Sequence, residues 1–362
     1  GSTPCRSRTG PRVADSYRLR VVDVIDETED ARSVVLEVPD DARDAFTYKP
    51  GQFLTVAVPS DRTGAVARCY SLSSTPYETD LLKFTVKRTV EGYGSNWIND
   101  NVRPGQHVTV LPPSGIFTPA SLDADLLLLA GGSGITPVIS IAKSALAKGS
   151  GKVVLLYANR DERSVIFAEE LAELARKHPD RFVVVHWLES VQGLPAAEHM
   201  KAFAEHLLEF DAFVCGPGPF MQGVVDALKQ LGFPRERRHQ EKFISLGGNP
   251  FGDEVEDVSS DAEDDEPAAR KGPAAVSGEL DGQPFAFDDW PPDQKLLDFL
   301  LAKGLDAPYS CREGNCSACA CRLLEGEVRM AANEVLDEED LADGIRLACQ
   351  SLPVSDEVTI SY

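Results

Sequence analysis

The sequence predicts a multidomain chain in which an antiparallel β-barrel, a parallel α/β sheet and a small α+β unit follow one another. Three observations support this order. Short strand-like runs separated by Pro, Gly and Asp fill residues 17–120, and apolar runs alternate with helical stretches over residues 121–249. Beyond an acidic stretch, residues 277–362 return to strands with one helix. A length of 362 residues fits two or three domains rather than one core.

The first unit is expected to be a barrel because its strands are short, numerous and bounded by turn residues. The runs YRLRVVDVID, RSVVLEVPD, GQFLTVAVP and LKFTVKRTV alternate between apolar and polar residues or stay apolar. Many such strands in succession are typical of antiparallel barrels. Residues 1–16 precede them without an apolar run, so we expect a disordered N-terminus and no secretory signal.

The second unit is expected to be a parallel sheet because strands and helices alternate. Strand-like runs occur in DLLLLAGG, KVVLLYANR, RFVVVHWLES and DAFVCGPG, and helical stretches such as FAEELAELARKH separate them. Residues 250–276 then form a segment that is dense in Asp and Glu and poor in large apolar residues. Such a segment cannot bury enough surface to order itself, so we predict an acidic linker there.

The third unit is predicted to be α+β. Strands are expected in GELDGQPFAFD, CRLLEGEVRM and EVTISY, with a helix in KLLDFLLAKG between the first of them and a cysteine-containing loop.

Four cysteines in this third unit have the spacing of an iron–sulfur site. Cys311, Cys316 and Cys319 stand as C-x4-C-x2-C in SCREGNCSAC, and Cys349 follows about thirty residues later. This spacing is typical of plant-type [2Fe–2S] clusters, in which four thiolates hold two irons. Gly314 allows the loop to turn sharply, because glycine has no Cβ to clash. We therefore predict a [2Fe–2S] cluster with these four cysteines as ligands.

A zinc site or a set of disulfides would be the alternatives for these cysteines. Structural zinc sites usually show two short C-x2-C pairs or added histidines, and no histidine follows His239. Disulfides need an oxidising compartment, which nothing in the sequence indicates. Zinc therefore stays open as the main alternative. Cys321 lies two residues past Cys319, and we interpret it as a small buried side chain rather than a fifth ligand.

The charge balance limits the kinds of partner. The chain has 58 acidic residues and 36 Lys or Arg residues, a formal net charge of -22. Such a charge disfavours nucleic acid and anionic membranes as partners. An acidic surface can dock on a basic face of a partner protein, although many acidic surfaces are only solvated. The longest apolar run, residues 126–130, is too short to span a bilayer, so we expect a cytoplasmic protein without membrane insertion.

Two segments of the predicted barrel carry residues suited to a phosphate and a planar ring. Arg68 can form a forked pair with a phosphate, and Tyr70 can stack on a planar ring. Residues 94–96 can offer backbone N–H groups at the start of a helix. Each feature taken alone is also consistent with an ordinary exposed strand or turn.

The parallel sheet carries three turns that directly follow strands. In LLLLAGGSGITP, Gly131, Gly132 and Gly134 separate a strand from a helix, with Pro137 in its first turn. Glycines let the backbone approach a pyrophosphate at a helix N-terminus, although the spacing is not G-x-G-x-x-G. A plain turn is the alternative. The later turns YANRDERS and VCGPGPFM follow strands too, and Cys215 stands at a carboxyl end, where α/β sheets bind ligands.

In this order, RCYSL, GGSGITP, CGPGPFM and the cysteine loop resemble the ferredoxin–NAD(P)H reductase superfamily. More narrowly, the chain from about residue 17 onward resembles one-chain reductases of bacterial multicomponent oxygenases. That resemblance implies an FAD-binding barrel, an NAD(P)H-binding α/β domain and a β-grasp [2Fe–2S] ferredoxin domain. ARCYSLSSTPY, VKRTVEGYGSNWI and YANRDERSVIFAEEL resemble, in particular, the reductase components of actinobacterial 3-ketosteroid 9α-hydroxylases.

The resemblance implies roles for the residues at matching positions. Arg68 is expected on the FAD pyrophosphate, Tyr70 against the isoalloxazine and Ser71 near flavin N5. Ser71 and Cys215 are the expected catalytic residues beside the hydride path. Further contacts with FAD are expected from Val86, Lys87, Gly94, Ser95 and Asn96. Contacts with the nicotinamide are expected from Gly132, Gly134, Thr136, Pro137, Gly216 and Pro217, and Glu241 and Phe243 match the segment that returns toward the flavin.

The choice of coenzyme depends on the turn after the second strand of the parallel sheet. Coenzyme contacts are expected there from Asn159, Arg160, Arg163 and Ser164. The arginines can pair with a 2′-phosphate, whereas the acids Asp161 and Glu162 would repel one. Because relatives of the steroid system are typically NADH enzymes, we expect NADH, with NADPH as the alternative.

The resemblance and electron counting together predict the function. A nicotinamide gives two electrons at once and a [2Fe–2S] cluster accepts one, so a flavin must stand between them. We expect the reductase component of a Rieske-type terminal oxygenase, a monomer that serves 3-ketosteroid 9α-hydroxylation. The alternatives are a reductase for another oxygenase, such as an acyl-CoA epoxidase or an alkane or aromatic oxygenase, and a redox-sensing protein without turnover.

Overall fold

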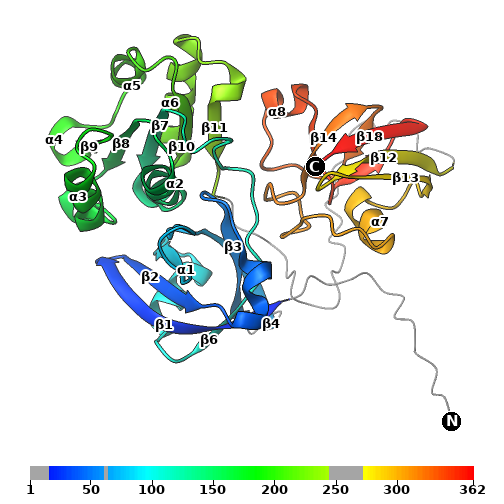
Figure 1. Ribbon diagram of the computed structural model, residues 1–362, viewed down its shortest axis with the longest axis horizontal. Coiled ribbons are helices and arrows are strands. Elements are labelled where there is room, and N and C mark those ends of the chain that lie inside the picture. Colours follow the sequence, from blue (N-terminus) through cyan, green and yellow to red (C-terminus); the bar gives the residue numbers. More distant parts are fainter. Residues whose placement is uncertain (1–15, 61–63, 244–271) are drawn as a thin grey trace. The chain divides into compact units, whose positions relative to one another are not determined.

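The computed structural model describes residues 16–60, 64–243 and 272–362, which divide into two compact units. One unit holds the barrel and the parallel sheet, and the other holds residues 272–362 (Figure 1). The expected disordered N-terminus, apart from Ser16, and residues 250–271 of the predicted linker lie outside the described residues. Within the ranges that the structure describes, no helix is both long and apolar enough to cross a membrane.

The first sheet is six-stranded and antiparallel, in the order β4-β3-β6-β1-β2-β5. An isolated bridge between Leu72 and Phe84 joins its two outer edges, so the sheet closes into the predicted barrel. Alternate apolar side chains from its strands fill one interior cluster. The elements are β1 (Tyr17–Thr28), β2 (Ala31–Glu37), the 3-10 helix η1 (Asp40–Phe46), β3 (Phe53–Ser60), β4 (Gly64–Ser71), β5 (Leu82–Lys87), α1 (Tyr93–Asn101) and β6 (His107–Val110).

The second sheet is five-stranded and parallel, in the order β11-β10-β7-β8-β9, as predicted. Helices cover both of its faces, which is why the central strand is apolar and buried at every residue. Its strands are β7 (Leu126–Gly131), β8 (Val153–Asn159), β9 (Phe182–Leu188), β10 (Asp211–Cys215) and β11 (Arg238–Glu241). Its helices are η2 (Gly132–Gly134), α2 (Ile135–Lys148), η3 (Glu162–Ser164), α3 (Ala168–Lys177), α4 (Glu189–Gln192), α5 (Ala197–Ala204), α6 (Gly218–Gln230) and η4 (Arg235–Arg237).

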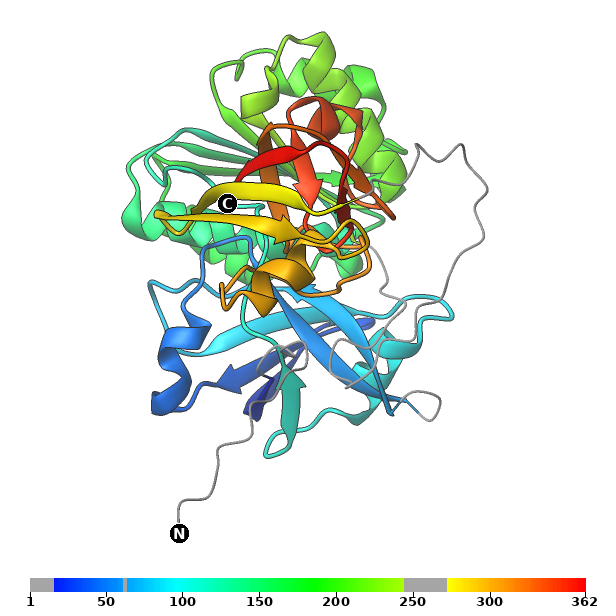
Figure 2. The same cartoon turned by 90° about the vertical axis from the view of Figure 1, so that its right-hand side faces the viewer.

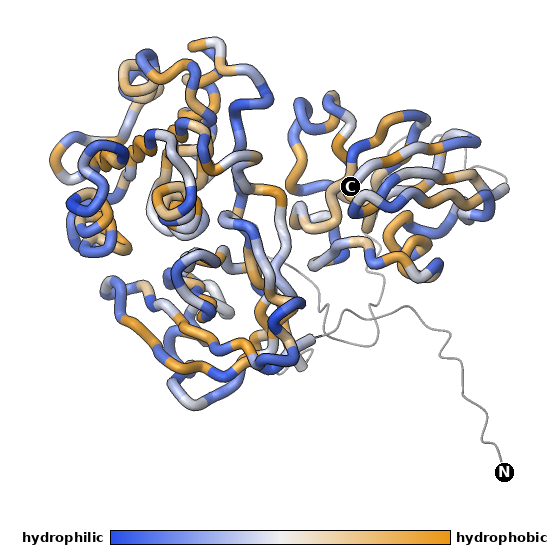
Figure 3. Tube along the Cα trace, viewed as in Figure 1, coloured by the Kyte–Doolittle hydropathy of each residue, from blue (hydrophilic) through white to orange (hydrophobic). Residues whose placement is uncertain are grey.

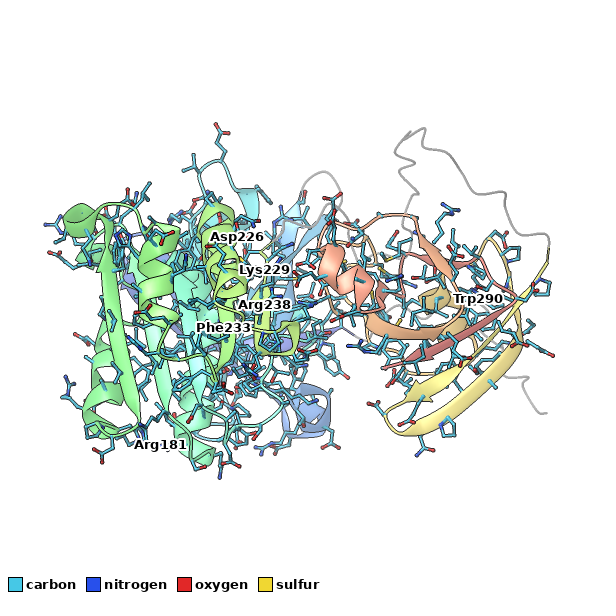
Figure 4. All side chains as sticks on the ribbon, turned by 90° about the horizontal axis from the view of Figure 1, so that it is seen from above. Arg181, Asp226, Lys229, Phe233, Arg238 and Trp290 are labelled. Carbon is cyan, nitrogen blue, oxygen red and sulfur yellow. The ribbon has the colours of Figure 1, made fainter. Side chains whose placement is uncertain are left out.

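The carboxyl end of α2 is fixed inside this domain by Arg181, which precedes β9 (Figure 4). Its guanidinium donates to the carbonyls of Gly151 at 3.0 Å, Leu146 at 3.2 Å and Ala145 at 2.9 Å. These carbonyls belong to the last turn of the helix and the loop after it. A cation at a helix carboxyl terminus also complements the helix dipole.

The second unit contains a five-stranded mixed sheet in the order β13-β12-β18-β14-β16, and a two-stranded sheet of β15 and β17. The apolar residues of helix α7 pack on this sheet. The same cluster contains the fully buried Trp290, which is labelled in Figure 4. Strand β12 begins at Ala274, so the predicted linker boundary at residue 276 is three residues too late. The elements are β12 (Ala274–Leu280), β13 (Gln283–Trp290), α7 (Leu296–Ala302), β14 (Ala320–Glu325), β15 (Val328–Met330), α8 (Glu338–Ala342), β16 (Ile345–Leu347), β17 (Ser351–Pro353) and β18 (Glu357–Ser361).

The hydropathy pattern explains the difference between the sheets. Along the barrel strands, hydrophobic and hydrophilic residues alternate (Figure 3), because one side of each strand faces the interior. The second view of the ribbon, Figure 2, shows the helices of the parallel sheet lying over its strands. That covering is what makes continuous apolar strands stable there.

Candidate cofactor sites

The flavin-side residues of the barrel converge although they are separated along the sequence. Arg68 and Tyr70 lie on β4, and the Arg68 side chain packs over Gly94, where an added Cβ would come within 2.8 Å of the Arg68 Cγ. The ring of Tyr70 stacks on Phe84 at 5.6 Å between centroids, and burial raises the pKa of its phenol. Ser71 ends β4 and is buried. The barrel therefore presents an arginine, an aromatic ring and a hydroxyl from one strand.

The start of α1 is held by the side chains of Ser95 and Asn96, which are predicted as FAD contacts. The Asn96 amide donates to the carbonyls of Thr89 at 3.0 Å and Gly92 at 2.6 Å, and it accepts from Arg88 at 3.0 Å. The Ser95 hydroxyl accepts from the backbone N–H of Thr89 at 3.0 Å. These bonds shape the turn before α1, so backbone N–H groups of the helix are what remains for an anion.

Two other predicted flavin contacts differ in what they can offer. The Val86 side chain is fully buried in the barrel core, so it cannot contact a ligand. The Lys87 side chain reaches toward the parallel sheet, where its Nζ lies 3.8 Å from the position a Cβ on Gly132 would take. Sequence analysis missed Asn99, a buried amide that donates to the carbonyls of Val86 at 3.2 Å and Ser95 at 2.8 Å.

The glycine turn between β7 and α2 is shaped by two close approaches. Gly132 has φ +52°, the left-handed region that favours glycine. A Cβ on Gly134 would come within 2.1 Å of the carbonyl oxygen of Cys215, so the first and third turns pack backbone against backbone. The Thr136 hydroxyl donates to the carbonyl of Ser133 at 3.0 Å, and Pro137 is buried in the first turn of α2. The first and third turns therefore lie side by side in the structure.

A buried thiol at the end of β10 lies beside the carboxyl group of Glu241 on β11. Cys215 is fully buried at the end of β10 and pairs in register with Glu241 of β11. Burial, reinforced by the neighbouring Glu241, raises the pKa of the Cys215 thiol well above its ordinary value. Burial also raises the pKa of Glu241 to about 8. After Cys215, Gly216 packs against Phe220 and Pro217 caps α6, whereas the Phe243 side chain is about half exposed.

The turn after β8 holds an amide without a partner. Asn159 is buried, and in the part of the chain that the structure describes neither atom of its amide has a hydrogen-bond partner. Asp161 accepts from the backbone N–H of Ser164 at 3.0 Å and from its hydroxyl at 2.9 Å, which lowers the pKa of that carboxyl. Ser164 is therefore engaged, while Arg160 and Arg163 are exposed. A buried amide beside two exposed arginines fits the ribose side of a dinucleotide.

In the second unit the four predicted cysteines are all buried. Three lie in the loop before β14, and Cys349 lies in the loop after β16. The sulfur of Cys311 accepts from the backbone N–H of Glu313 at 3.4 Å, and that of Cys349 accepts from the Gln350 amide at 3.5 Å. Gly314 has φ +81°, and a Cβ there would come within 2.8 Å of the Ala332 carbonyl oxygen. N–H groups directed at sulfur are typical of iron–sulfur sites.

Two further observations bear on whether the four cysteines fit a two-iron cluster. Across residues 16–60, 64–243 and 272–362, no three His, Cys, Asp or Glu side chains are arranged around one metal ion. A [2Fe–2S] cluster does not require that, since each iron takes only two protein ligands. The hydroxyl of Tyr362 is buried without a partner among the described residues, in the core that contains Cys319 and Cys349. Cys321 is buried in that core as well, as predicted.

Three domain families match the chain: an oxidoreductase FAD-binding domain over residues 18–118, an oxidoreductase NAD-binding domain over residues 128–226 and a 2Fe-2S iron-sulfur cluster binding domain over residues 279–354. The chain is 56% identical to the ferredoxin reductase component of 3-ketosteroid-9-alpha-monooxygenase from Rhodococcus rhodochrous, over 97% of this chain and 98% of the relative. The same component from Mycolicibacterium smegmatis is 55% identical over 95% and 96%. Phthalate dioxygenase reductase, a solved structure, matches with a TM-score of 0.54 and 25% identity over 96% of this chain and 98% of that chain.

Fold, sites and matches together define a class of protein: a flavin-containing oxidoreductase that takes electrons from a nicotinamide and carries its own iron–sulfur centre. The chain belongs to the family of FAD- and NAD-binding reductases with a C-terminal [2Fe–2S] ferredoxin domain. The predicted fold class and cofactors are confirmed, and the cysteines belong to an iron–sulfur domain rather than to a zinc site.

Proposed function

We propose that this protein is the reductase component of a 3-ketosteroid 9α-monooxygenase and passes electrons from NADH to a Rieske-type terminal oxygenase. The observation that carries the proposal is the 56% identity that extends over 97% of the chain. The aligned region covers all three domains, including the ferredoxin domain that a partner would have to recognise. We place the protein in the cytoplasm as a monomer.

The division of labour follows the three predicted domains. We assign FAD to residues 17–120, the nicotinamide to residues 121–249 and the electron carrier to the domain that begins with β12 at Ala274. When bound, FAD accepts a pair of electrons from a nicotinamide and releases them singly, which is the chemistry that a [2Fe–2S] cluster needs. The protein itself contributes positioning and electrostatics.

On the flavin side, the residues of β4 do the positioning. Arg68 is suited to pair with the pyrophosphate, since its stem is already packed over Gly94 and its guanidinium forms two-pronged bonds to phosphate. The Tyr70 ring, stacked on Phe84, offers its other face to the flavin ring. Ser71, buried at the end of the strand, supplies a hydroxyl at the reacting edge.

On the nicotinamide side, turns rather than charged side chains hold the ligand. Residues 132–134 offer backbone N–H groups just before α2, and this suits the negative pyrophosphate. Cys215 keeps a proton on Sγ because burial raises its pKa, so a neutral group faces the ring. Asn159 has unpaired amide atoms for the ribose. We propose NADH because the Asp161 carboxylate, held by Ser164, stands in the turn that we assign to the ribose and would repel a 2′-phosphate.

The test is a reconstituted electron-transfer assay. Purified protein loaded with FAD, iron and sulfide is mixed with a 3-ketosteroid 9α-hydroxylating Rieske oxygenase, a 3-ketosteroid and either NADH or NADPH. We expect the 9α-hydroxylated product, coupled to coenzyme oxidation, with NADH at least about tenfold better in kcat/KM, a difference of about 1.4 kcal/mol.

A Rieske oxygenase that acts on an aromatic acid is the matched control partner. We expect it to be reduced much more slowly by the same preparation. Equal rates with both oxygenases would contradict the assignment to the steroid system. Flavin that NADH does not reduce would contradict the reductase itself.

A further inference from the structure

The barrel and the parallel sheet are joined along one side of helix α2. Three side chains of this helix, spaced four residues apart, contact the barrel segment 73–77: Ser140, Ser144 and Lys148. The Ser140 hydroxyl donates to the Ser74 carbonyl at 2.7 Å, and the Ser144 hydroxyl shares a hydrogen bond with the Thr75 hydroxyl at 2.7 Å. Residues four apart lie on one face of a helix, so this face is dedicated to the barrel.

A charged bridge lies beside this face. The Glu170 carboxylate of α3 accepts from the Lys143 Nζ of α2 at 2.8 Å and contacts the Lys83 Nζ of β5 at 3.4 Å. The Lys143 side chain is 7% exposed. Lys83 also lies over the ring of Phe167 at 5.0 Å. One carboxylate thus connects a strand of the barrel with two helices of the other domain.

Each element that contributes a side chain to the bridge is next to a turn that we assign to the flavin or the nicotinamide. Helix α2 begins directly after the glycine turn at residues 132–134. Helix α3 begins directly after the turn at residues 159–167, which ends in Phe167 with a left-handed φ of 62°. On the barrel side, segment 73–77 follows Ser71 by two residues, and β5 ends at Lys87. A shift at the bridge would therefore move the flavin turn relative to both nicotinamide turns.

The bridge is poorly explained as a source of stability. The Lys83 and Lys143 ammonium groups are largely removed from water around Glu170, with Glu27 as a second carboxyl group near both, and desolvation lowers the pKa of Lys143. Buried ion pairs often contribute no more stability than apolar residues of the same volume. The two serines of α2 and the barrel cluster already join the domains without charge. Lysine and glutamate do, however, fix a distance and a direction more narrowly than apolar contacts do.

We propose that the Lys143–Glu170–Lys83 bridge positions the nicotinamide turns against the flavin turn and so sets the hydride-transfer distance. These are positioning residues, since none of them lies in the ligand turns themselves. The inference rests on the proposed flow of electrons from a nicotinamide to a flavin. A misplacement of about 1 Å at a reacting centre can cost about 100-fold in rate.

The test measures hydride transfer in the FAD- and cluster-loaded protein by rapid mixing with NADH and with NADH deuterated at the transferred position. For Glu170→Gln and Lys143→Met we expect a hydride-transfer rate constant about 10- to 100-fold lower, with the NADH dissociation constant changed less than about threefold. We also expect a larger deuterium isotope effect and an FAD content equal to that of the parent protein.

Two variants separate positioning from a general loss of structure. Glu173→Gln lies on the same helix and removes an exposed ion pair with Arg176, whose atoms are 2.7 Å apart, so it should leave the rate unchanged. Lys143→Arg keeps the charge and should retain most of the rate, even if Lys143→Met proves too unstable to hold FAD.

Parent-like rate constants in both Glu170→Gln and Lys143→Met would overturn the inference. So would a loss explained wholly by weaker NADH binding, or a Lys143→Arg variant as slow as Lys143→Met. Flavin reduction is observed directly and needs no oxygenase. Failure of the steroid assignment would therefore leave the result interpretable, whereas a parent protein whose flavin NADH cannot reduce would remove the proposed function itself.

Discussion

The cluster loop and the flavin–nicotinamide centre differ in how their ligand groups are encoded. Three of the four cluster cysteines lie between residues 311 and 319, and the groups that bind iron are side chains of one residue type. The flavin–nicotinamide centre takes its groups from turns on two sheets, and many of them are backbone N–H groups. A cluster site can therefore be lost by one substitution, whereas a site made of backbone is lost when a turn changes shape.

The largest expected effect tests the cluster side. Cys349→Ser should reduce electron delivery to the oxygenase by at least about 100-fold, since it removes a thiolate ligand of the iron. Reduction of the flavin by NADH should stay within about twofold of the parent protein, because Cys349 belongs to the other compact unit. The two rates are measured on one preparation, by flavin absorbance and by product formation. Unchanged product formation would contradict the proposed electron path.

The next largest effect is expected at the flavin–nicotinamide centre, whose binding groups are mainly backbone N–H groups. Gly134→Ala should slow hydride transfer about 10- to 100-fold and lower stability by about 1–3 kcal/mol, because the new Cβ meets the carbonyl of Cys215. Rapid mixing with NADH and chemical denaturation measure the two quantities.

Gly223→Ala is the matched control for this substitution. Gly223 lies inside α6 with nothing within 4 Å of the added Cβ, so the variant should gain about 0.5–1 kcal/mol at unchanged rate. Similar behaviour of both alanine variants would show that the packed turns do not govern the nicotinamide site.

The sequence predicted most of the fold because its signals are local. Alternation along the barrel strands and continuous apolar runs in β7, β8 and β10 follow from the faces that each strand buries. The order of the three domains and the four cysteines could be predicted for the same reason. The start of β12 could not be placed to the residue, since the acidic segment and the first residues of the strand have no sharp compositional boundary.

The sites were predicted less completely because side-chain direction depends on tertiary contacts. Asn96 and Val86 stand at the predicted places, but one side chain shapes a turn and the other fills the core. The bridge through Glu170 had no sequence signal, since its partners are 27 and 87 residues away. The proton on Glu241 follows from burial at the end of β11, which spacing alone does not reveal.

A smaller effect is expected on the way protein stability depends on pH, through Glu241 beside the nicotinamide turn. Burial raises the pKa of Glu241 from an ordinary 4.5 to about 8, so between these values the folded protein binds a proton that the unfolded chain has released. Stability should therefore fall as pH rises through this window, by at most about 1.4 kcal/mol per pH unit, and level off above it. Glu241→Gln should remove this slope. Denaturation curves of both proteins at pH 5 and pH 8 measure it, and parallel changes would contradict the raised pKa.

The smallest expected effect returns to the cluster loop and asks whether every buried thiol there is a ligand. Cys321 lies two residues from Cys319 and is buried in the same core, yet it stands on β14, where neighbouring strands pack around it. Cys321→Ala should keep the iron content, visible spectrum and product formation of the parent protein, and lose about 1 kcal/mol of stability from the vacated sulfur volume. Iron analysis and thermal unfolding measure these quantities. A variant without iron would mean that the ligand set extends beyond the four spaced cysteines. Residue spacing would then not be enough to define the cluster site.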